Sequence, residues 1–475
     1  MNLRKHSNII RNDIFLNHEN NIAVQCPKGE SYTYGELLDY NKILFKHLKE
    51  RSLVFSLSKN TIGSICGYLT FITNGVVPLM LDAELDQGFL NNLILTYKPE
   101  YIWLPSQRIH EIPNGKIIAS FFDYSLLKLG SGVKVDLHND LALLLTTSGS
   151  TGSPKLVKIS YENIYFNAKS ISSYLLINQA ERPITALPMY YSFGLSIINS
   201  HIINGATILL TNSSFMEKDF WSFIKSYKAS SLSGIPYSFE ILKKLRFFNM
   251  ELPYLKTITQ AGGKLNDELN REFAEYCNNT GKRFFVMYGQ TEASPRMGYL
   301  PHDHSISKLG SMGIAIPGGE FSLIDEKGNL IDQSDTLGEL VYKGKNVSMG
   351  YALCRTDLAK GDENNGVLVT GDMAKRDHDG YYYIVGRKKR FIKLFGNRVS
   401  LDETERLLKN IIPDCACIGE DDRMLIFITD ESIKKKVENY LSSKTGINSN
   451  AFEVIYINKI PRTSSGKTVH FKLDI

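Results

Sequence analysis

One segment, Leu141 to Ser160 (LALLLTTSGSTGSPKLVKIS), constrains this chain more than any other. It opens with an apolar run typical of a buried strand, passes into a loop of small hydroxylated residues and glycines, and continues into a second strand-like run, Leu156 to Ile159. Successive backbone N–H groups in such a loop can form a concave nest for an anion, and hydroxyls add donors around phosphate oxygens. We therefore predict a phosphate-binding loop fixed between two strands.

Two other interpretations of this loop fit the sequence less well. A flexible Ser/Gly linker is seldom fixed between two apolar strands. The G-x-x-x-x-G-K-[ST] spacing of the Walker A loop is absent, and the segment after this loop is expected to be a strand where the Walker loop leads into a helix.

Composition narrows the class of protein. The chain has 475 residues, of which 43% are hydrophobic and 22% charged, so a sizeable globular core is expected. It has 55 Lys and Arg and 50 Asp and Glu, and no block of basic residues resembles a nucleic-acid-binding arm. The N-terminus has no continuous apolar stretch and no run reaches the length of a transmembrane helix. We expect a cytoplasmic protein that acts on neither nucleic acid nor membrane.

The cysteines indicate neither a disulfide framework nor a zinc site. Six cysteines in a chain of this length do not make a disulfide framework. Cys415 and Cys417 have no second pair and no histidine cluster at zinc spacing, so we interpret both as strand residues.

The pattern along the chain predicts two domains. Up to residue 386, short apolar strands alternate with amphipathic helices, which indicates an α/β domain. Predicted strands are 75–82, 205–210 and 256–259, and predicted helices are 219–228 and 267–278. A basic run, Arg387 to Arg390, interrupts the pattern, and residues 387–475 read as a small α+β domain. That domain has a helix opened by Ser400 and Glu403, strands at 415–418, 424–428 and 452–457, and a second helix over 432–443.

The loop TTSGSTGSPK resembles the signature of the superfamily of acyl- and aryl-CoA synthetases, adenylation domains of peptide synthetases and firefly-type luciferases. Further motifs follow in the family's order: Tyr288 to Glu292 (YGQTE), Gly338 to Leu340 with Gly350 and Tyr351, Thr370 to Asp372 before Gly386 and Arg387, Gly396 to Arg398 with Glu403, and Pro461 to Lys467 (PRTSSGK). The resemblance covers the chain from Tyr32 to Lys467. It implies a large multi-layer α/β N-terminal domain, with two β-α subdomains and a small β-barrel-like subdomain, and a small, mobile α+β C-terminal domain.

The resemblance also implies a reaction: a carboxylic acid attacks the α-phosphorus of ATP, and the acyl-adenylate then passes its acyl group to a thiol. Two unit charges about 4 Å apart interact by about 4 kcal/mol at an effective dielectric near 20, so neutralising the two anions is the main work of such a site. Thr291 is expected to contact the α-phosphate, Glu292 to ligate Mg²⁺, and Asp372 with Arg387 to hold the ribose. The nucleotide-contacting residues implied are Thr147, Ser148, Gly149, Ser150, Thr151, Gly152, Lys155, Gly262, Gly263, Lys264, Tyr288, Gly289, Gln290, Asp372, Arg387 and Arg398.

Three residues are expected to be catalytic: Lys467, Thr291 and Lys155. A lysine near a C-terminus is ordinarily a solvated charge, so the role of Lys467 rests on the resemblance, which implies that it neutralises charge developing between the carboxylate and the α-phosphate. Lys389 matches the family's hinge position, about which the small domain swings between the two half-reactions.

Some positions depart from the family pattern. Leu156 follows Lys155 where the family usually has glycine, and Tyr191 stands where many CoA synthetases have a histidine. No acidic residue lies in the run from Tyr191 to Gly194, which disfavours a free α-amino acid because its buried ammonium would lack a partner. The small domain also lacks the usual Leu-Pro…Pro stretch before its last strand.

The acyl pocket is expected at Tyr191, Phe193, Pro236, Phe239 and Gly262, and its aromatic content favours a mostly apolar acyl or aryl acid. Three functions remain open at this point. The thiol is that of coenzyme A, or the phosphopantetheine of a carrier protein. Alternatively, the chain is a degenerate nucleotide-binding module with a regulatory role.

Overall fold

The computed structural model describes residues 12–130, 136–146, 155–394, 397–409, 411–420, 423–445, 451–462, 468–470 and 473. By its internal contacts the chain divides into two compact units. The first comprises Met1–Leu309, Ala315–Glu320 and Lys343–Leu368, and the second comprises Gly310–Ile314, Phe321–Tyr342 and Val369–Ile475. Each unit is described by itself.

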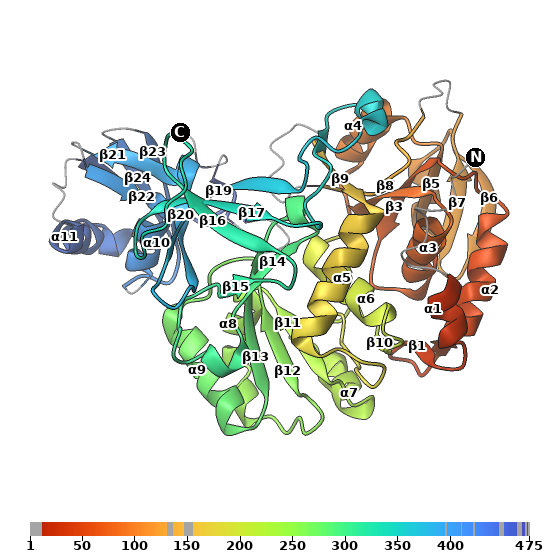
Figure 1. Cartoon of the computed structure of the whole chain (residues 1–475), viewed down its shortest axis with the longest axis horizontal. Helices are drawn as coiled ribbons and strands as arrows, with labels where there is room; N and C mark the ends of the chain where they lie inside the picture. Colours follow the sequence, from red (N-terminus) through yellow and green to blue (C-terminus); the bar gives the residue numbers. More distant parts are fainter. Residues whose placement is uncertain are drawn as a thin grey trace. The chain divides into compact units, whose positions relative to one another are not determined.

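An eight-stranded sheet forms the first half of unit one, in the order β18-β9-β8-β4-β3-β5-β7-β6 (Figure 1). Strands β5, β3, β4 and β8 run parallel. At the two sides, β9 pairs antiparallel with β8, β7 with β5, and β6 with β7. The central strands are continuous apolar runs because both faces of a parallel sheet are buried. The strands are β3 (Leu53–Ser58), β4 (Val77–Asp82), β5 (Tyr101–Pro105), β6 (Lys116–Phe121), β7 (Tyr124–Lys128), β8 (Leu141–Thr146), β9 (Leu156–Ser160) and β18 (Tyr351–Ala352).

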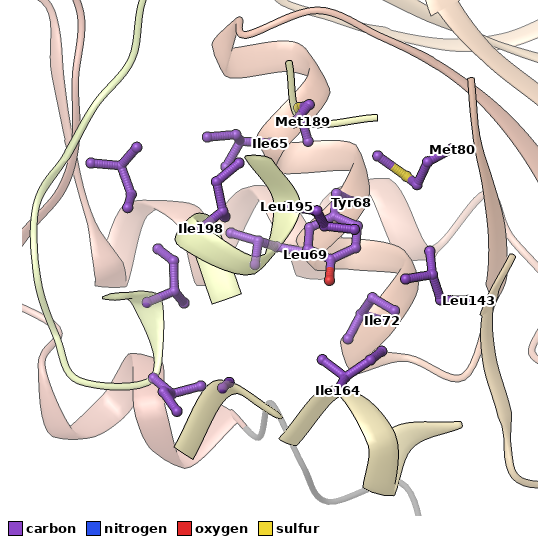
Figure 2. Close-up of a cluster of buried hydrophobic side chains, with 14 of the residues drawn as sticks. Ile65, Tyr68, Leu69, Ile72, Met80, Leu143, Ile164, Met189, Leu195 and Ile198 are labelled. Carbon is purple, nitrogen blue, oxygen red and sulfur yellow. The ribbon is translucent and has the colours of Figure 1, made fainter. Parts of the chain in front are cut away.

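Helices α2, α3, α5 and α6 contribute to the hydrophobic core on this sheet. Figure 2 shows Tyr68 and Leu69 of α3 facing Leu195 and Ile198 of α6. The Tyr68 hydroxyl donates to Asn199 Oδ1 at 2.8 Å, which satisfies both polar groups inside an apolar core. The helices of this half are α1 (Asn12–Asn17), α2 (Tyr34–Phe45), α3 (Ile62–Thr73), α4 (Gln87–Tyr97), α5 (Tyr161–Leu175) and α6 (Ser192–Ile202). A small sheet, β10-β1-β2, is formed by β1 (Ile22–Gln25), β2 (Ser31–Thr33) and β10 (Ile208–Leu209).

A second sheet of unit one has the order β11-β12-β13-β14-β15, with β11, β12 and β13 parallel. Its core is rich in phenylalanine and joins helices α7, α8 and α9 to these strands. The elements are α7 (Lys218–Ser226), β11 (Ser231–Gly234), α8 (Pro236–Lys244), β12 (Thr257–Gln260), α9 (Asp267–Asn279), β13 (Arg283–Gly289), β14 (Arg296–Tyr299) and β15 (Ile314–Ala315).

The second unit contains a four-stranded sheet, β16-β17-β19-β20, a hairpin, β21-β22, and a three-stranded sheet, β23-β24-β25. Helices α10 and α11 pack on the last sheet through a separate core that includes Leu408, Leu441 and Val454. The elements are β16 (Glu320–Ile324), β17 (Gly338–Lys343), β19 (Val367–Arg376), β20 (Tyr382–Arg387), β21 (Phe391–Leu394), β22 (Asn397–Ser400), α10 (Leu401–Leu408), β23 (Cys415–Glu420), β24 (Arg423–Ile428), α11 (Lys434–Thr445) and β25 (Phe452–Tyr456). Short 3₁₀ turns are η1 (Ser106–Glu111), η2 (Phe247–Asn249), η3 (Thr291–Ala293), η4 (His302–His304), η5 (Arg355–Ala359), η6 (Lys388–Arg390) and η7 (Glu431–Ile433).

The α/β fold with a small α+β C-terminal part is confirmed. Ser400 caps α10 by accepting from the Glu403 amide, as predicted, and Cys415 and Cys417 are buried strand residues. Over the part of the chain that the structure describes, no helix combines the length and the apolar character needed to cross a bilayer. The boundary at residues 386 and 387 stays a prediction.

Candidate functional site

Lys155 and Glu292 both contact the side chain of Tyr351. The loop between β8 and β9 has its two ends side by side, because Thr146 pairs with Leu156 across the antiparallel ladder. The ammonium of Lys155 lies 3.3 Å from the centre of the Tyr351 ring, and the Tyr351 hydroxyl donates to Glu292 Oε1 at 2.8 Å. Strand β18 carries Tyr351 to this position by pairing with β9. A cation and a carboxylate from distant parts of the sequence are thus held together.

The YGQTE motif forms a rigid corner at the end of β13. A Cβ on Gly289 would lie 1.8 Å from the carbonyl oxygen of Pro295, so no side chain fits at this position. Thr291 follows in η3, and its hydroxyl lies 3.3 Å from that of Ser192 in the first turn of α6. The backbone of Glu292 is fixed as well, because its carbonyl accepts from the Ser348 amide at 2.8 Å. Gln290 Nε2 donates to the Tyr288 hydroxyl at 3.4 Å.

The loop after β12 approaches Tyr191 and the start of α8. Gly262 has a φ of +86°, and a Cβ there would lie 3.0 Å from both Tyr191 Oη and Ile235 Cγ2. Only glycine meets both conditions at low cost. A Cβ on Gly263 would likewise contact Pro236 at 3.2 Å. Tyr191, Pro236 and the two glycines are therefore together, as expected from the sequence.

Two predicted residues of this region have partners of their own. Lys264 Nζ lies 3.7 Å from Asp267 Oδ1, at the start of α9. Phe239 packs in the phenylalanine-rich core, with its ring centre 4.7 Å from that of Phe273 and 5.9 Å from that of Phe284. Phe239 sits there because α8 turns its apolar face toward β11–β13, so the structure does not bring it to Tyr191.

In the second unit, Asp372 and Arg387 are directly opposite each other on β19 and β20. Asp372 is 3% exposed, and Arg387 Nε lies 2.7 Å from its Oδ1. The Asp372 amide donates to the Thr370 hydroxyl at 3.0 Å, and that hydroxyl donates to the Leu340 carbonyl. Thr370 to Asp372 lie inside β19, although the sequence also suits a turn ahead of a strand. This pair therefore provides a buried carboxylate with a half-exposed guanidinium beside it.

In the basic run after β20, the residues on either side of Lys389 form ion pairs. Lys388 Nζ lies 2.7 Å from Glu339 Oε2 on β17, and Arg390 Nη2 lies 2.7 Å from Glu405 Oε1 on α10. Lys389 lies between these two anchored neighbours and is exposed.

Several predicted residues lie outside the part of the chain that the structure describes: Thr147, Ser148, Gly149, Ser150, Thr151, Gly152 and Lys467. For Arg398, only the backbone, in β22, is described. Their roles stay predictions. Tyr351 belongs to a predicted motif but has no role expected from the sequence, and the contacts of Ser192 and Ile235 were not predicted. No sequence signal marks these contacts, because each depends on tertiary pairing.

Glu292 fits as a single protein ligand of Mg²⁺. Mg²⁺ is usually held by one or two carboxylates together with substrate phosphates and water. Among the described residues no cluster of three or more His, Cys, Asp or Glu side chains could hold a metal by itself. Glu292 has one carboxylate oxygen engaged by a neutral hydroxyl donor, which leaves acceptor capacity for a cation shared with phosphates.

Buried histidine gives the fold a pH dependence. Burial lowers the pKa of His201 on α6 from 6.5 to about 4, and the nearby positive charge of Arg296 acts in the same direction. The unfolded chain therefore binds more protons than the folded one between pH 6.5 and about 4. The contribution of His201 is fully present above its unfolded pKa and is lost as the pH falls.

We expect His201→Gln to lose less stability than the wild type between pH 7 and pH 5. The difference should be about 2 kcal/mol in the free energy of unfolding. Urea unfolding of both proteins at the two pH values measures it. Equal losses would contradict the neutral, buried histidine.

Comparison with known proteins gives consistent matches. The sequence profile described as "AMP-binding enzyme" matches residues 15–352. The 2-succinylbenzoate–CoA ligase of Listeria monocytogenes serotype 4b (strain F2365) is 26% identical over 460 residues, which cover 94% of each chain. The feruloyl-CoA synthase of an Amycolatopsis species is 26% identical over 349 residues, covering 71% of this chain and 68% of that one.

Among solved structures, the O-succinylbenzoate coenzyme A synthetase of Bacillus subtilis in complex with AMP matches with a TM-score of 0.80, at 21% identity over 98% of this chain and 97% of that chain. Identity this low shows the shared fold. Because the AMP-binding profile matches well over half of the sequence, this chain belongs to the family of AMP-binding enzymes.

Proposed function

We propose that this chain is an AMP-forming acid–thiol ligase that activates a carboxylic acid with ATP and transfers its acyl group to coenzyme A. The observation that carries the proposal is the cluster of Lys155, Tyr351 and Glu292, with Thr291 fixed beside it by Ser192. The names of the relatives, which are CoA ligases and synthetases, support the same activity.

In the first half-reaction a carboxylate oxygen forms a bond to the α-phosphorus of ATP. The bond from that phosphorus to the bridging oxygen breaks, and pyrophosphate leaves with the electron pair. Lys155 neutralises phosphate charge, Thr291 donates its hydroxyl to the α-phosphate, and Lys467 stabilises the charge that develops on the phosphoryl group. Glu292 would hold Mg²⁺, which supplies further charge neutralisation at the phosphates.

In the second half-reaction the thiolate of the acceptor attacks the acyl carbon, and AMP leaves with the carboxyl oxygen. We propose a hinge at Lys389 between a large domain, residues 1–386, and a small one, residues 387–475. The ion pairs of Lys388 with β17 and of Arg390 with α10 support this, because they anchor the chain on either side of one exposed residue. Backbone change at such a hinge is absorbed by few residues.

ATP–pyrophosphate exchange with a panel of carboxylic acids tests the proposal and identifies the acid. Product analysis with coenzyme A against a phosphopantetheinylated carrier protein separates the two acceptors. We favour coenzyme A, and we propose a cytoplasmic enzyme, because ATP and coenzyme A are abundant there. Lack of exchange with every acid would favour the third function, a degenerate nucleotide-binding module, against which Lys155, Glu292, Asp372 and Lys467 all argue.

We expect Asp372→Asn to raise the KM for ATP by about 10- to 100-fold, because a hydrogen bond to a charged group contributes about 1.5–3 kcal/mol. The amide keeps the shape of the side chain but no longer accepts two ribose hydroxyls or balances Arg387. Asp379→Asn is the matched control, in the exposed turn between β19 and β20. An unchanged KM for ATP in Asp372→Asn would contradict the ribose role.

A further inference from the structure

A buried asparagine closes the turn that leads from η3 into β14. Asn346 Nδ2 donates to the carbonyl oxygen of Ala293 at 2.7 Å and to that of Arg296 at 2.9 Å. These two carbonyl groups lie on either side of the turn, so one amide group sets the distance between them. Asn346 is 0% exposed and therefore acts through the turn, without reaching solvent itself.

Asn346 belongs to residues 345–351, which we call the linking segment, and two further donors of this segment reach Glu292. The Ser348 amide donates to the Glu292 carbonyl at 2.8 Å, and the Tyr351 hydroxyl donates to Glu292 Oε1 at 2.8 Å. The backbone of Glu292, its carboxylate and the turn that follows it are thus held by one stretch of chain.

Helix α5 fixes the linking segment on both sides of Asn346. Asn163 Nδ2 donates to the carbonyl oxygens of Lys345 and Val347, at 2.7 and 2.8 Å. The other end of the same amide, Oδ1, accepts from the Ser160 amide at 2.8 Å, where the helix begins. The residues that flank Asn346 are therefore attached to the first turn of a 15-residue helix.

Strand β9 holds the same segment. The Met349 amide donates to the Lys158 carbonyl at 2.8 Å, and the Lys158 amide donates to the Gly350 carbonyl at 2.9 Å. Lys158 follows Lys155 by three residues. The linking segment thus joins the strand next to Lys155 to the corner at η3.

The η3 turn depends on donors of this kind. A carbonyl oxygen only accepts hydrogen bonds, and a buried acceptor that loses its donor is left unsatisfied, so the turn would move toward another partner. A displacement of about 1 Å at a reacting group can lower a rate by about 100-fold. The turn held by Asn346 directly follows Thr291 and Glu292, the two groups expected at the α-phosphate and at Mg²⁺.

We propose that Asn346 is a positioning residue for acyl-adenylate formation, and that it holds Glu292 and Thr291 in the geometry that binds Mg²⁺ and the α-phosphate. This inference rests on the proposed function and extends it to a side chain that acts through the η3 turn. Groups that orient a metal ligand from behind commonly contribute about 10- to 100-fold to metal affinity or activity.

Asn346→Asp tests the inference because it keeps the shape of the side chain and replaces the donor with an oxygen that faces two carbonyl groups. We expect kcat for pyrophosphate exchange to fall by about 10- to 100-fold and half-saturation with MgCl₂ to move to a higher concentration. The KM for the acid should stay within about 3-fold of the wild type, because the acyl pocket is not altered. Calorimetric titration of ATP at increasing MgCl₂ should show the same shift without any acid present.

Asn41→Asp is the matched control, at a buried asparagine of α2. Its Nδ2 donates to the Thr73 hydroxyl at 2.6 Å, and a hydroxyl can turn to donate to a carboxylate, as a carbonyl group cannot. We expect it to change neither kcat nor the Mg²⁺ requirement. Asn163→Asp keeps the acceptor for the Ser160 amide but loses the donor to the linking segment, and it should give a smaller loss with the same Mg²⁺ shift. It serves as the test if Asn346→Asp does not fold.

A folded Asn346→Asp with the kcat and the Mg²⁺ requirement of the wild type would overturn the inference. So would equal losses in Asn346→Asp and Asn41→Asp, because they would indicate a general effect on the fold. Absence of exchange with every acid in the wild type would instead contradict the proposed function, and the Mg²⁺ dependence of ATP binding would still test the role of Asn346.

Discussion

Lys467→Ala should lower the rate of acyl-adenylate formation by about 10³- to 10⁵-fold, the range observed when a cation that stabilises a transferring phosphoryl group is removed. The first half-reaction brings a carboxylate to a triphosphate, and a cation positioned only as charge develops acts on the transition state itself. Transfer of the acyl group from supplied acyl-adenylate to the thiol should remain within about 3-fold of the wild type, because no phosphoryl bond forms in that step. The two half-reactions are measured separately, by pyrophosphate exchange and by thioester formation.

Lys459→Ala is the matched control for this experiment. It removes a lysine of the same C-terminal segment, exposed and close to Lys467 in sequence, and should change neither half-reaction. If both half-reactions fell together in Lys467→Ala, the separation of roles between two conformations of the small domain would be wrong. The role of Lys467 comes from the motif PRTSSGK, so this result would test the resemblance directly.

The fold was predictable where local pattern and burial agree. The apolar run at residues 75–82 predicts a buried strand, and all but the last residue of β4 are buried. The helix predicted over residues 267–278 ends within one residue of the end of α9, because its apolar residues follow the helical period. The strand predicted over residues 205–210 is shorter in the structure, where β10 comprises only Ile208–Leu209. Gly205 has a φ of +71°, outside the β region of the backbone, and a pattern of apolar letters does not reveal it.

The site was predictable as a set of motifs, but its contacts were not. Arg296 follows YGQTE and, as an arginine, reads as a surface residue. Its burial depends on tertiary contacts with Tyr174 on α5, Phe193 on α6 and Met287 on β13. Phe239 shows the reverse case: it is expected in the acyl pocket as part of the run PYSF, yet its ring packs against that of Phe273 in a core. Periodicity gives a face of a helix, but it does not say what that face contacts.

The basic run after β20 illustrates the same limit. Consecutive charges are ordinarily solvated, yet Lys388 pairs with Glu339 and Arg390 with Glu405, partners that are remote in the sequence. What the structure adds is these two ion pairs on either side of the exposed Lys389, together with a hydrogen bond from the Arg387 amide to Asp402 on α10.

Glu292→Gln should lower kcat for pyrophosphate exchange by about 10²- to 10³-fold and move the requirement for Mg²⁺ to higher concentrations. The amide is nearly isosteric, and its oxygen can still accept from the Tyr351 hydroxyl, so the corner at η3 should keep its geometry. What is lost is the negative charge that a hard cation prefers. Exchange rates titrated with MgCl₂ measure both effects, and thermal unfolding checks that the variant folds.

Tyr351→Phe separates the charge of Glu292 from its position. It removes the hydroxyl that donates to Glu292 Oε1 at 2.8 Å, but it leaves the carboxylate and the ring that faces Lys155. Because Tyr351 contacts Glu292 and Lys155 and positions them, we expect a loss of about 10-fold or less, with a small shift in the Mg²⁺ titration. A loss in Tyr351→Phe as large as that in Glu292→Gln would mean that the orientation of this carboxylate matters as much as its charge. An unchanged Mg²⁺ requirement in Glu292→Gln would mean that Glu292 is not the metal ligand, whatever the effect on kcat.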